Sequence, residues 1–182
     1  MENINKTNTR QLTLIGVMSA VTCILGPLSL PIGLVPISLT NLAIYFSVYI
    51  LGRRRGTISY MVYLLLGLIG LPVFSGFSGG LPKLAGPTGG YLIGFIFMAF
   101  ISGLFIDKFS NKTYMGFLGM VIGTTVTYLF GTAWLAYVAH MTFNKALAVG
   151  VLPFVPGDLI KIIIASLVGP QIRKRLMSAG LY

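Results

Sequence analysis

Long apolar segments, separated by short segments that carry nearly all of the basic residues, constrain the fold of this chain most. A transmembrane helix needs about 20 predominantly apolar residues. Charged residues make up only 9% of the sequence, whereas a soluble domain has about a quarter. We therefore expect an all-α membrane protein with six transmembrane helices. The segments expected to span the membrane are residues 11–30, 35–51, 57–74, 91–106, 115–139 and 153–170.

The distribution of Lys and Arg predicts the orientation of these helices. With the N-terminus inside, ten basic residues fall in the inner segments 1–10, 52–56, 107–114 and 171–182. The outer loops then contain only Lys83 and Lys145. Because cytoplasmic loops are enriched in basic residues, we expect both termini in the cytoplasm. We also expect residues 1–182 to form a single integral-membrane domain that crosses a bacterial plasma membrane several times. The topology also accounts for the net charge of +10, so no nucleic-acid partner is expected.

The motifs give little support to an enzyme. The sequence has no G-x-x-x-x-G-K-[ST] loop, so any ATP hydrolysis would have to come from a partner. The string PGD at 156–158 is similar to part of an intramembrane aspartyl protease motif, which needs two carboxylates that share a proton. The other acids, Glu2 and Asp107, lie at the opposite face in the expected topology. We predict no catalytic residue, no metal and no cofactor.

The segment PFVPGDLIKIII (153–164) is apolar except for one acid and one base. Asp158 and Lys161 are at positions i and i+3 and therefore share a face of a helix. Ionisable side chains inside a membrane are costly and usually mark a functional site. In the expected orientation the pair lies in the outer part of the membrane, which predicts a site that opens outward. The alternative is an ion pair that only stabilises the helix within the bundle.

The outer loop over residues 71–90 (LPVFSGFSGGLPKLAGPTGG) is rich in glycine and proline and poor in charge. Loops of this length are commonly functional or disordered, and the aromatic residues favour a lid that covers a ligand. At its end, Thr88 is expected to cap the fourth helix. Gly89 and Gly90 then present backbone N–H groups that can bind an anion such as a carboxylate. A tight turn with an ordinary cap explains the same residues equally well.

Polar and aromatic residues at the outer ends of other helices are also candidates. The prolines of LPIGLVPISLTN (30–41) precede Thr40 and Asn41, and spans interrupted by proline or glycine point to transport sites. Trp134 and Tyr137 lie near the outer end of the fifth helix, where aromatic residues are typical of a membrane interface. Their alternative role is to form a wall of the ligand site.

Small residues recur at four-residue spacing on two helices. Gly16 and Ala20 lie in the first span, and Gly119 and Gly123 form a GxxxG in the fifth. Such pairs most often allow close packing of helices in membranes. The spacing alone leaves open whether the partner helix belongs to this chain or to another protein.

Six short motifs follow one another along nearly the whole chain. They are VPISLTN (35–41), LGRRRG (51–56), LLGLIGLPVFSGFSGG (65–80), GPTGGYLIGF (86–95), FGTAWLA (130–136) and PFVPGDLIK (153–161). In this order and spacing they resemble the BioY family, the biotin-specific substrate-binding subunits (S components) of energy-coupling factor (ECF) transporters.

The resemblance implies a six-helix fold that captures biotin from outside. It also implies partners, namely a transmembrane scaffold subunit and two cytoplasmic ATPase subunits. The first helix would contact the scaffold through small residues, for which Gly16 and Ala20 are the nearest match. The expected substrate-binding residues are Asp158, Lys161, Tyr91, Gly90, Gly89, Thr88, Asn41, Trp134 and Tyr137.

Biotin suits these residue types. Its ureido ring offers two N–H donors and a carbonyl acceptor, its thioether ring is apolar, and its valerate chain ends in a carboxylate. Asp158 can accept from the ureido N–H groups, and Lys161 can donate to a carbonyl or carboxylate. The aromatic residues Tyr91, Trp134 and Tyr137 are expected to pack against the apolar rings.

The alternative function is a stand-alone channel or secondary carrier for a small solute. An ion-coupled carrier would be expected to have further polar groups within its spans. Because Asp158 and Lys161 are the only ionisable pair in the predicted spans, the binding-subunit interpretation is preferred.

Overall fold

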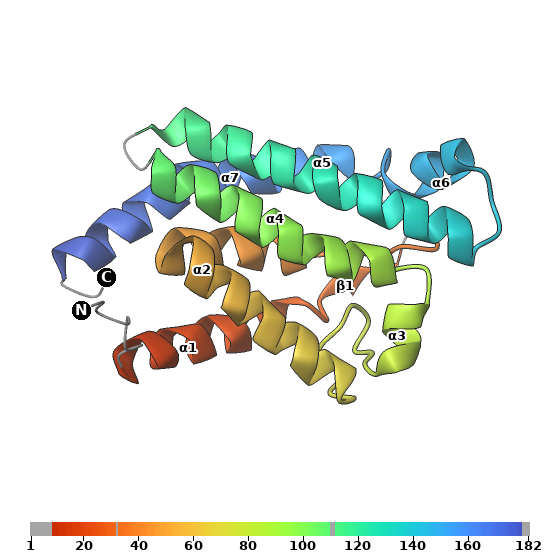
Figure 1. Ribbon diagram of the computed structural model, residues 1–182, viewed down its shortest axis with the longest axis horizontal. Helices are drawn as coiled ribbons and strands as arrows, with labels where there is room; N and C mark the ends of the chain where they lie inside the picture. The colour runs from red at the N-terminus through yellow and green to blue at the C-terminus, as the bar shows by residue number, and fades with distance from the viewer. Residues whose placement is uncertain (1–8, 32, 110–111, 180–182) are drawn as a thin grey trace, which may run out of the picture.

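The computed structural model describes residues 9–31, 33–109 and 112–179, and this part of the chain is mostly helical (Figure 1). The long helices are α1 (Thr9–Leu25), α2 (Thr40–Leu68), α4 (Gly89–Lys108), α5 (Thr113–Val138) and α7 (Val155–Ser178). The shorter elements are the helices α3 (Leu81–Ala85) and α6 (Phe143–Gly150) and the antiparallel strands β1 (Ser29–Leu30) and β2 (Ile37–Ser38). Lys6, which was counted for the predicted orientation, lies outside the described residues.

The long helices lie side by side and run between two ends of a bundle (Figure 1). The start of α1, the end of α7 and the end of α4 lie at one end, whereas α3 and α6 lie at the other. At the first end Asp107 contacts Arg53 and Arg173. We call this the basic end, and the end that contains α3 and α6 the cavity end.

Helix α2 is interrupted at Gly52, where a φ of 75° and a ψ of 178° leave the helical range. This combination is essentially restricted to glycine. Residues 40–51 and 53–68 are therefore two helices joined by one residue. They approach closely, because a Cβ added to Gly56 would lie 2.9 Å from the Cα of Val48. The chain thus turns back at Gly52 towards the cavity end.

Several predicted boundaries are wrong. The expected inner loop over 52–56 is reduced to Gly52, because helix resumes at the next residue. The second helix begins at Thr40 rather than at 35, since the preceding residues form the β1–β2 hairpin. The expected outer loop over 71–90 contains the helix α3, and the residues between the fifth and sixth expected spans, 140–152, contain the helix α6. Strands of two residues and helices of five to eight residues are too short to leave a clear periodic signal.

Aromatic side chains form the centre of the bundle between α2, α4, α5 and α7. The largest fully buried side chains include Tyr45, Tyr60, Tyr63, Phe74 and Met98. The hydroxyl of Tyr60 donates to the carbonyl of Leu92 at 2.7 Å, and that of Tyr63 donates to the carbonyl of Val73 at 3.1 Å. These bonds join the second half of α2 to α4 and to the loop before α3, which fixes the walls of the cavity described below.

The predicted close packing at Gly119 and Gly123 is confirmed, and the partner is α4 of the same chain. A Cβ added to Gly123 would lie 2.9 Å from the Oγ of Ser102 and 3.0 Å from the carbonyl oxygen of Met98. Glycine removes the side chain that would separate the two helices. Helices α4 and α5 accordingly form the most extensive helix pair of the bundle.

The outward faces of the long helices are apolar. Helices α4, α5 and α7 are long and apolar enough to cross a membrane, and α1 is a shorter apolar helix. In α2 the break at Gly52 and the basic residues 53–55 interrupt the apolar run. Large exposed apolar side chains on α4, α5 and α7 include Phe97, Phe100, Leu129, Phe130, Ile160 and Leu167. Soluble monomers rarely expose so much contiguous apolar surface, so the fold is that of a membrane protein.

Candidate functional site

A cavity of about 650 Å3, counting the solvent at its opening, lies at the cavity end. It is enclosed by the β1–β2 hairpin, both ends of α2, the loop before α3, the start of α4, the middle of α5 and the start of α7. Its walls are mostly apolar and aromatic, with Val35, Tyr63, Phe95 and Phe154 among them. A concave, mostly apolar site with a few polar groups is the usual form of a small-molecule site.

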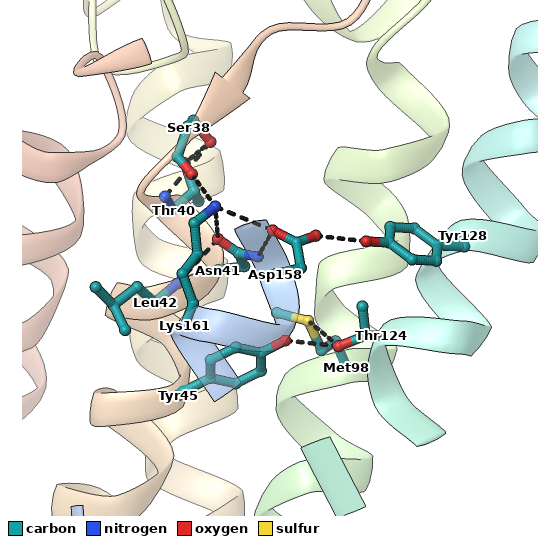
Figure 2. A network of polar contacts seen from close by, with 10 residues as sticks. All are labelled: Ser38, Thr40, Asn41, Leu42, Tyr45, Met98, Thr124, Tyr128, Asp158 and Lys161. Atoms are coloured by element: carbon teal, nitrogen blue, oxygen red, sulfur yellow. Dashed lines mark hydrogen bonds and ion pairs between the residues drawn. The ribbon is translucent and has the colours of Figure 1, made fainter. Parts of the chain in front are cut away.

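Asp158 is the centre of the polar network in this cavity (Figure 2). Its Oδ1 accepts from the Nδ2 of Asn41 at 2.8 Å and from the Nζ of Lys161 at 3.0 Å. Its Oδ2 accepts from the hydroxyl of Tyr128 at 2.6 Å. The network therefore joins α2, α5 and α7 around one carboxylate. Only 8% of Asp158 and 8% of Lys161 is exposed, so both charges are shielded from water.

Lys161 uses all of its hydrogen-bonding capacity within the protein. Its Nζ donates to the carbonyl of Ser38 at 2.7 Å, to the Oδ1 of Asn41 at 3.0 Å and to Asp158 (Figure 2). A lysine ammonium has three N–H donors, whereas a carboxylate has about four acceptor positions. Asp158 receives three donors and keeps one position, on Oδ2. Asp158 is thus able to accept from a ligand, while Lys161 holds Asp158 and Asn41 in place.

Two members of the network were not predicted. Tyr128 lies in the middle of α5, next to the hydroxyl-bearing residues Thr124, Thr125 and Thr127, and this group of hydroxyls was the signal that pointed to it. Ser38 takes part through its backbone carbonyl, which the sequence does not reveal. Below them, the hydroxyls of Tyr45 and Thr124 are 2.6 Å apart and connect α2 to α5 (Figure 2).

The start of α4 contributes to the cavity in a different way from that expected. Thr88 lines the cavity, but its Oγ1 donates to the carbonyl of Lys83 at 3.4 Å and does not cap the helix. The predicted side-chain cap is therefore wrong. A Cβ added to Gly89 would lie 3.1 Å from the Nε1 of Trp134, and one added to Gly90 would lie 3.0 Å from the Phe130 carbonyl oxygen. Gly90 thus allows α5 to pack against the start of α4, whereas Gly89 chiefly accommodates the nearby carbonyl of Leu84 in α3.

The three predicted aromatic residues occupy different environments. Tyr91 lines the cavity, and its hydroxyl donates to the carbonyl of Gly150 at 2.9 Å. Trp134 donates from its Nε1 to the carbonyl of Gly86 at 2.9 Å and lies outside the cavity lining, beneath the turn before α4. Tyr137 is 77% exposed and points away from the bundle. Only Tyr91 is placed to contact a ligand directly.

Lys83 provides a positive charge beside the cavity and was not predicted as a site residue. It lies on α3, and its Nζ donates to the carbonyl of Ser75 at 3.3 Å. Ser75 itself lines the cavity. Partial burial lowers the pKa of Lys83 from its ordinary value, because the charged form loses hydration.

Gly16 and Ala20 lie together on an exposed face of α1. No atom lies within 4 Å of a Cβ added to Gly16. The opposite face of α1 packs against α2, where the Oγ of Ser19 donates to the carbonyl of Ser59 at 2.9 Å. The predicted contact residues are thus accessible to another helix.

Within the described residues no group of three His, Cys, Asp or Glu side chains is close enough to hold a metal ion. The polar atoms at the cavity are one carboxylate, one amide, one ammonium and several hydroxyl groups. Such a set provides hydrogen-bond donors and acceptors for a neutral or anionic organic molecule.

Comparison with known proteins supports the resemblance noted in the sequence. A profile described as the BioY family matches residues 1–178. The chain belongs to the BioY family. The biotin transporter BioY of Thermotoga maritima is 40% identical to this BioY-family chain over 166 residues, which cover 91% of the chain and 96% of the relative. The biotin transporter BioY of Rhizobium etli is 40% identical over 173 residues, covering 89% and 92%.

The fold agrees with this assignment. A crystal structure of the S-component for biotin from an ECF-type ABC transporter matches the BioY-family chain with a TM-score of 0.86 and 34% identity, covering 95% of both chains. Because the family is one of transporters, the prediction of a transport protein rather than an enzyme is confirmed.

Proposed function

We propose that the chain binds biotin at the cavity end and mediates its uptake as the high-affinity substrate-binding subunit of an ECF transporter. The observation that carries this proposal is Asp158, a shielded carboxylate that receives three donors and keeps one acceptor position at the cavity. The relatives described as biotin transporters support the choice of substrate. Biotin is the transported substrate, and no cofactor takes part.

The ureido ring of biotin fits the unused groups of the network. A ureido N–H can donate to the Oδ2 of Asp158. Asn41 uses one N–H of its amide for Asp158 and has a second N–H that can donate to the ureido carbonyl. Asp158 and Asn41 therefore offer an acceptor and a donor side by side, as the edge of the ureido ring requires.

The remainder of biotin fits the other parts of the cavity. Tyr91, Phe95 and Phe154 offer apolar surface for the thioether ring and the valerate chain. The carboxylate then extends towards Ser75 and Lys83 at the opening, where an ammonium can pair with it. Lys83 is preferred to Lys161 for this role because Lys161 has no N–H left for a ligand.

We also propose six membrane spans with both termini in the cytoplasm of a bacterial plasma membrane. The spans are α1, the two parts of α2, α4, α5 and α7. The concentration of basic residues at the end opposite the cavity supports this orientation through the positive-inside rule. The cavity then opens to the outside, where biotin is available.

The proposed partners are a transmembrane scaffold subunit and two ATPase subunits, which supply the energy for release. Family membership and the lack of a phosphate-binding loop in this sequence support the need for such partners. The exposed face of α1 at Gly16 and Ala20 is the proposed contact with the scaffold. Gly16→Leu and Ala20→Leu should impair co-purification of the scaffold with little change in biotin binding. Normal co-purification with both variants would contradict this contact.

The substrate is tested with the purified chain alone in detergent. Isothermal titration should give a clear binding signal with biotin and none with riboflavin or thiamine. Biotinamide, which lacks the carboxylate, should bind more weakly than biotin but more tightly than these vitamins. A response to another vitamin without a response to biotin would overturn the proposal.

A further inference from the structure

A second groove lies at the basic end, between the end of α4, the start of α5 and the last part of α7. Its empty volume is about 1100 Å3, counting the solvent at its opening. Three basic side chains line it, Lys112, Arg173 and Lys174, against a single carboxylate, Asp107. The function proposed above leaves this groove without a role.

The carboxylate of Asp107 is already engaged. Its Oδ1 accepts from the Nη2 of Arg173 at 2.8 Å, and its Oδ2 accepts from the backbone N–H of Arg53 at 2.7 Å. Within the described residues, neither Lys112 nor Lys174 has an ion pair with a carboxylate. The groove therefore presents an excess of positive charge that Asp107 does not neutralise.

A buried tyrosine also lines this groove. Tyr49, on the first half of α2, is 3% exposed. It packs against α5 and α7, since a Cβ added to Gly116 would lie 2.5 Å from its hydroxyl oxygen and one added to Gly169 would lie 2.5 Å from its Cγ. The hydroxyl oxygen is covered by the surrounding protein, so Tyr49 closes the inner side of the groove and is not itself a donor to a ligand.

The rest of the lining is apolar. Ile106, Phe109, Pro170 and Met177 form this part. Asp158 and Arg173 are both on α7, and a rise of 1.5 Å per residue places them roughly 22 Å apart along the helix. This is less than the hydrocarbon thickness of about 30 Å. In the proposed topology the groove therefore lies at the inner membrane boundary, where phosphate groups meet acyl chains.

We propose that the groove binds a phosphate-bearing anion, and specifically the head group of an anionic phospholipid of the inner leaflet. Lys112 and Lys174, beside the Arg173–Asp107 pair, contact the phosphate, and the apolar lining receives the start of an acyl chain. Basic pockets between transmembrane helices on the cytoplasmic side suit such head groups. This inference depends on the proposed membrane orientation and is independent of the identity of the transported substrate.

The experiment is a titration of the full-length chain in detergent, followed by native mass spectrometry. The probes are dioleoyl phosphatidylglycerol, dioleoyl phosphatidylcholine and inorganic phosphate. The groove variant Lys112→Gln/Lys174→Gln is compared with Arg54→Gln/Arg175→Gln, which also removes two exposed basic residues at the basic end but leaves the groove lining unchanged. Tyr49→Phe, which removes only a covered hydroxyl beside the groove, is a second control.

We expect the wild type to bind phosphatidylglycerol in preference to phosphatidylcholine. The groove variant should bind it about tenfold more weakly, because each basic residue contributes to attraction of an anionic lipid. Tyr49→Phe and the control variant should both bind as the wild type does. Size-exclusion profiles and thermal unfolding establish that each variant is folded.

Three results would overturn the proposal. Equal losses in the groove variant and the control variant would indicate a diffuse attraction of the basic end. Full binding or competition by inorganic phosphate, with no further gain from the lipid, would assign the groove to a soluble anion instead. Equal binding of phosphatidylcholine would likewise contradict a site for an anionic head group.

Discussion

The two ends of the bundle each contain a carboxylate that holds helices together, but in different surroundings. At the cavity end, Asp158 receives donors from α2, α5 and α7. At the basic end, Asp107 of α4 receives donors from α2 and α7. The side chain of Asp158 is 12% exposed, whereas that of Asp107 is 37% exposed.

The difference in exposure explains why similar chemistry serves two purposes. Water can occupy the remaining acceptor positions of Asp107, so these positions favour no particular ligand. The remaining position of Asp158 is shielded, and an unfilled hydrogen-bonding position in such surroundings is costly. A ligand that offers an N–H group in the right place removes this cost. We infer that Asp107 mainly joins helices, whereas Asp158 both joins helices and binds substrate.

The largest expected effect is that of Asp158→Asn on biotin affinity. The substitution removes a charged acceptor from the ligand and leaves Lys161 without its counter-charge. Hydrogen bonds to charged groups contribute roughly 1.5–3 kcal/mol, so affinity should fall by roughly 10- to 150-fold. Isothermal titration of the purified variant measures the change. Lys161→Met should also weaken binding, because it strands the carboxylate in shielded surroundings.

The double variant Asp158→Asn/Lys161→Met separates ligand binding from helix joining. If the pair only joined helices, replacing both residues would restore folding and leave the biotin affinity near the wild-type value. We expect a folded protein that binds biotin poorly. A folded double variant with unchanged affinity would remove Asp158 from the site.

A smaller loss of affinity, about tenfold, is expected for Tyr128→Phe. The phenol hydroxyl donates to the oxygen of Asp158 that is proposed to receive the ligand, so its loss alters the position of that acceptor. Titration with biotin measures the effect, and Tyr137→Phe on the same helix is the control because Tyr137 is exposed. Equal affinities of both variants would show that Tyr128 does not position Asp158.

Biotin affinity should also depend on pH through Lys83. Burial holds the pKa of free Lys83 below its ordinary value, and a bound carboxylate raises this pKa. Biotin affinity should therefore be highest at a pH below the pKa of Lys83 in the free protein. It should fall as the pH rises from that pKa to the higher pKa of Lys83 in the biotin complex. Lys83→Met should weaken binding several-fold, by about 1 kcal/mol, and remove this dependence. Lys145→Met, an exposed change on α6, should do neither.

The smallest effect on affinity is expected for Asp107→Asn. Two donors lose a charged acceptor, so the free energy of unfolding should fall by roughly 1–2 kcal/mol, and thermal unfolding should begin at a lower temperature. Because the change lies at the opposite end, biotin affinity should stay within about twofold of the wild type. A loss of affinity as large as that of Asp158→Asn would contradict the division between the two ends.

The chemistry of the cavity could be predicted from sequence better than its geometry. Asp158, Lys161, Asn41, Tyr91 and Thr88 were all proposed from the sequence, and all of them line the cavity. An acid and a base in an apolar segment are conspicuous because charges are costly there. Asp158 and Lys161 can therefore be identified as site residues from the sequence alone, because they are a single acid–base pair three residues apart in an apolar segment.

The rotation of α5 could not be predicted in the same way. Apolar residues lie on every side of this helix, so its sequence does not indicate which face is turned inward. The structure turns Thr124, Thr127 and Tyr128 towards the cavity. Leu135, two turns after Tyr128, is buried, whereas Tyr137 is two residues further and points outward. The sequence therefore indicated that Trp134 and Tyr137 lie towards one end of the fifth helix but not the direction in which either side chain points.

The single-residue turn at Gly52 has a consequence for how the chain enters the membrane. With the proposed topology, its two flanking helices are consecutive spans with no loop between them. In the folded protein the two spans are held together as a hairpin from their first turn, so each buries one face of the other next to the break. We expect them to enter the membrane as a pair, with the arginines at 53–55 retained on the side of synthesis.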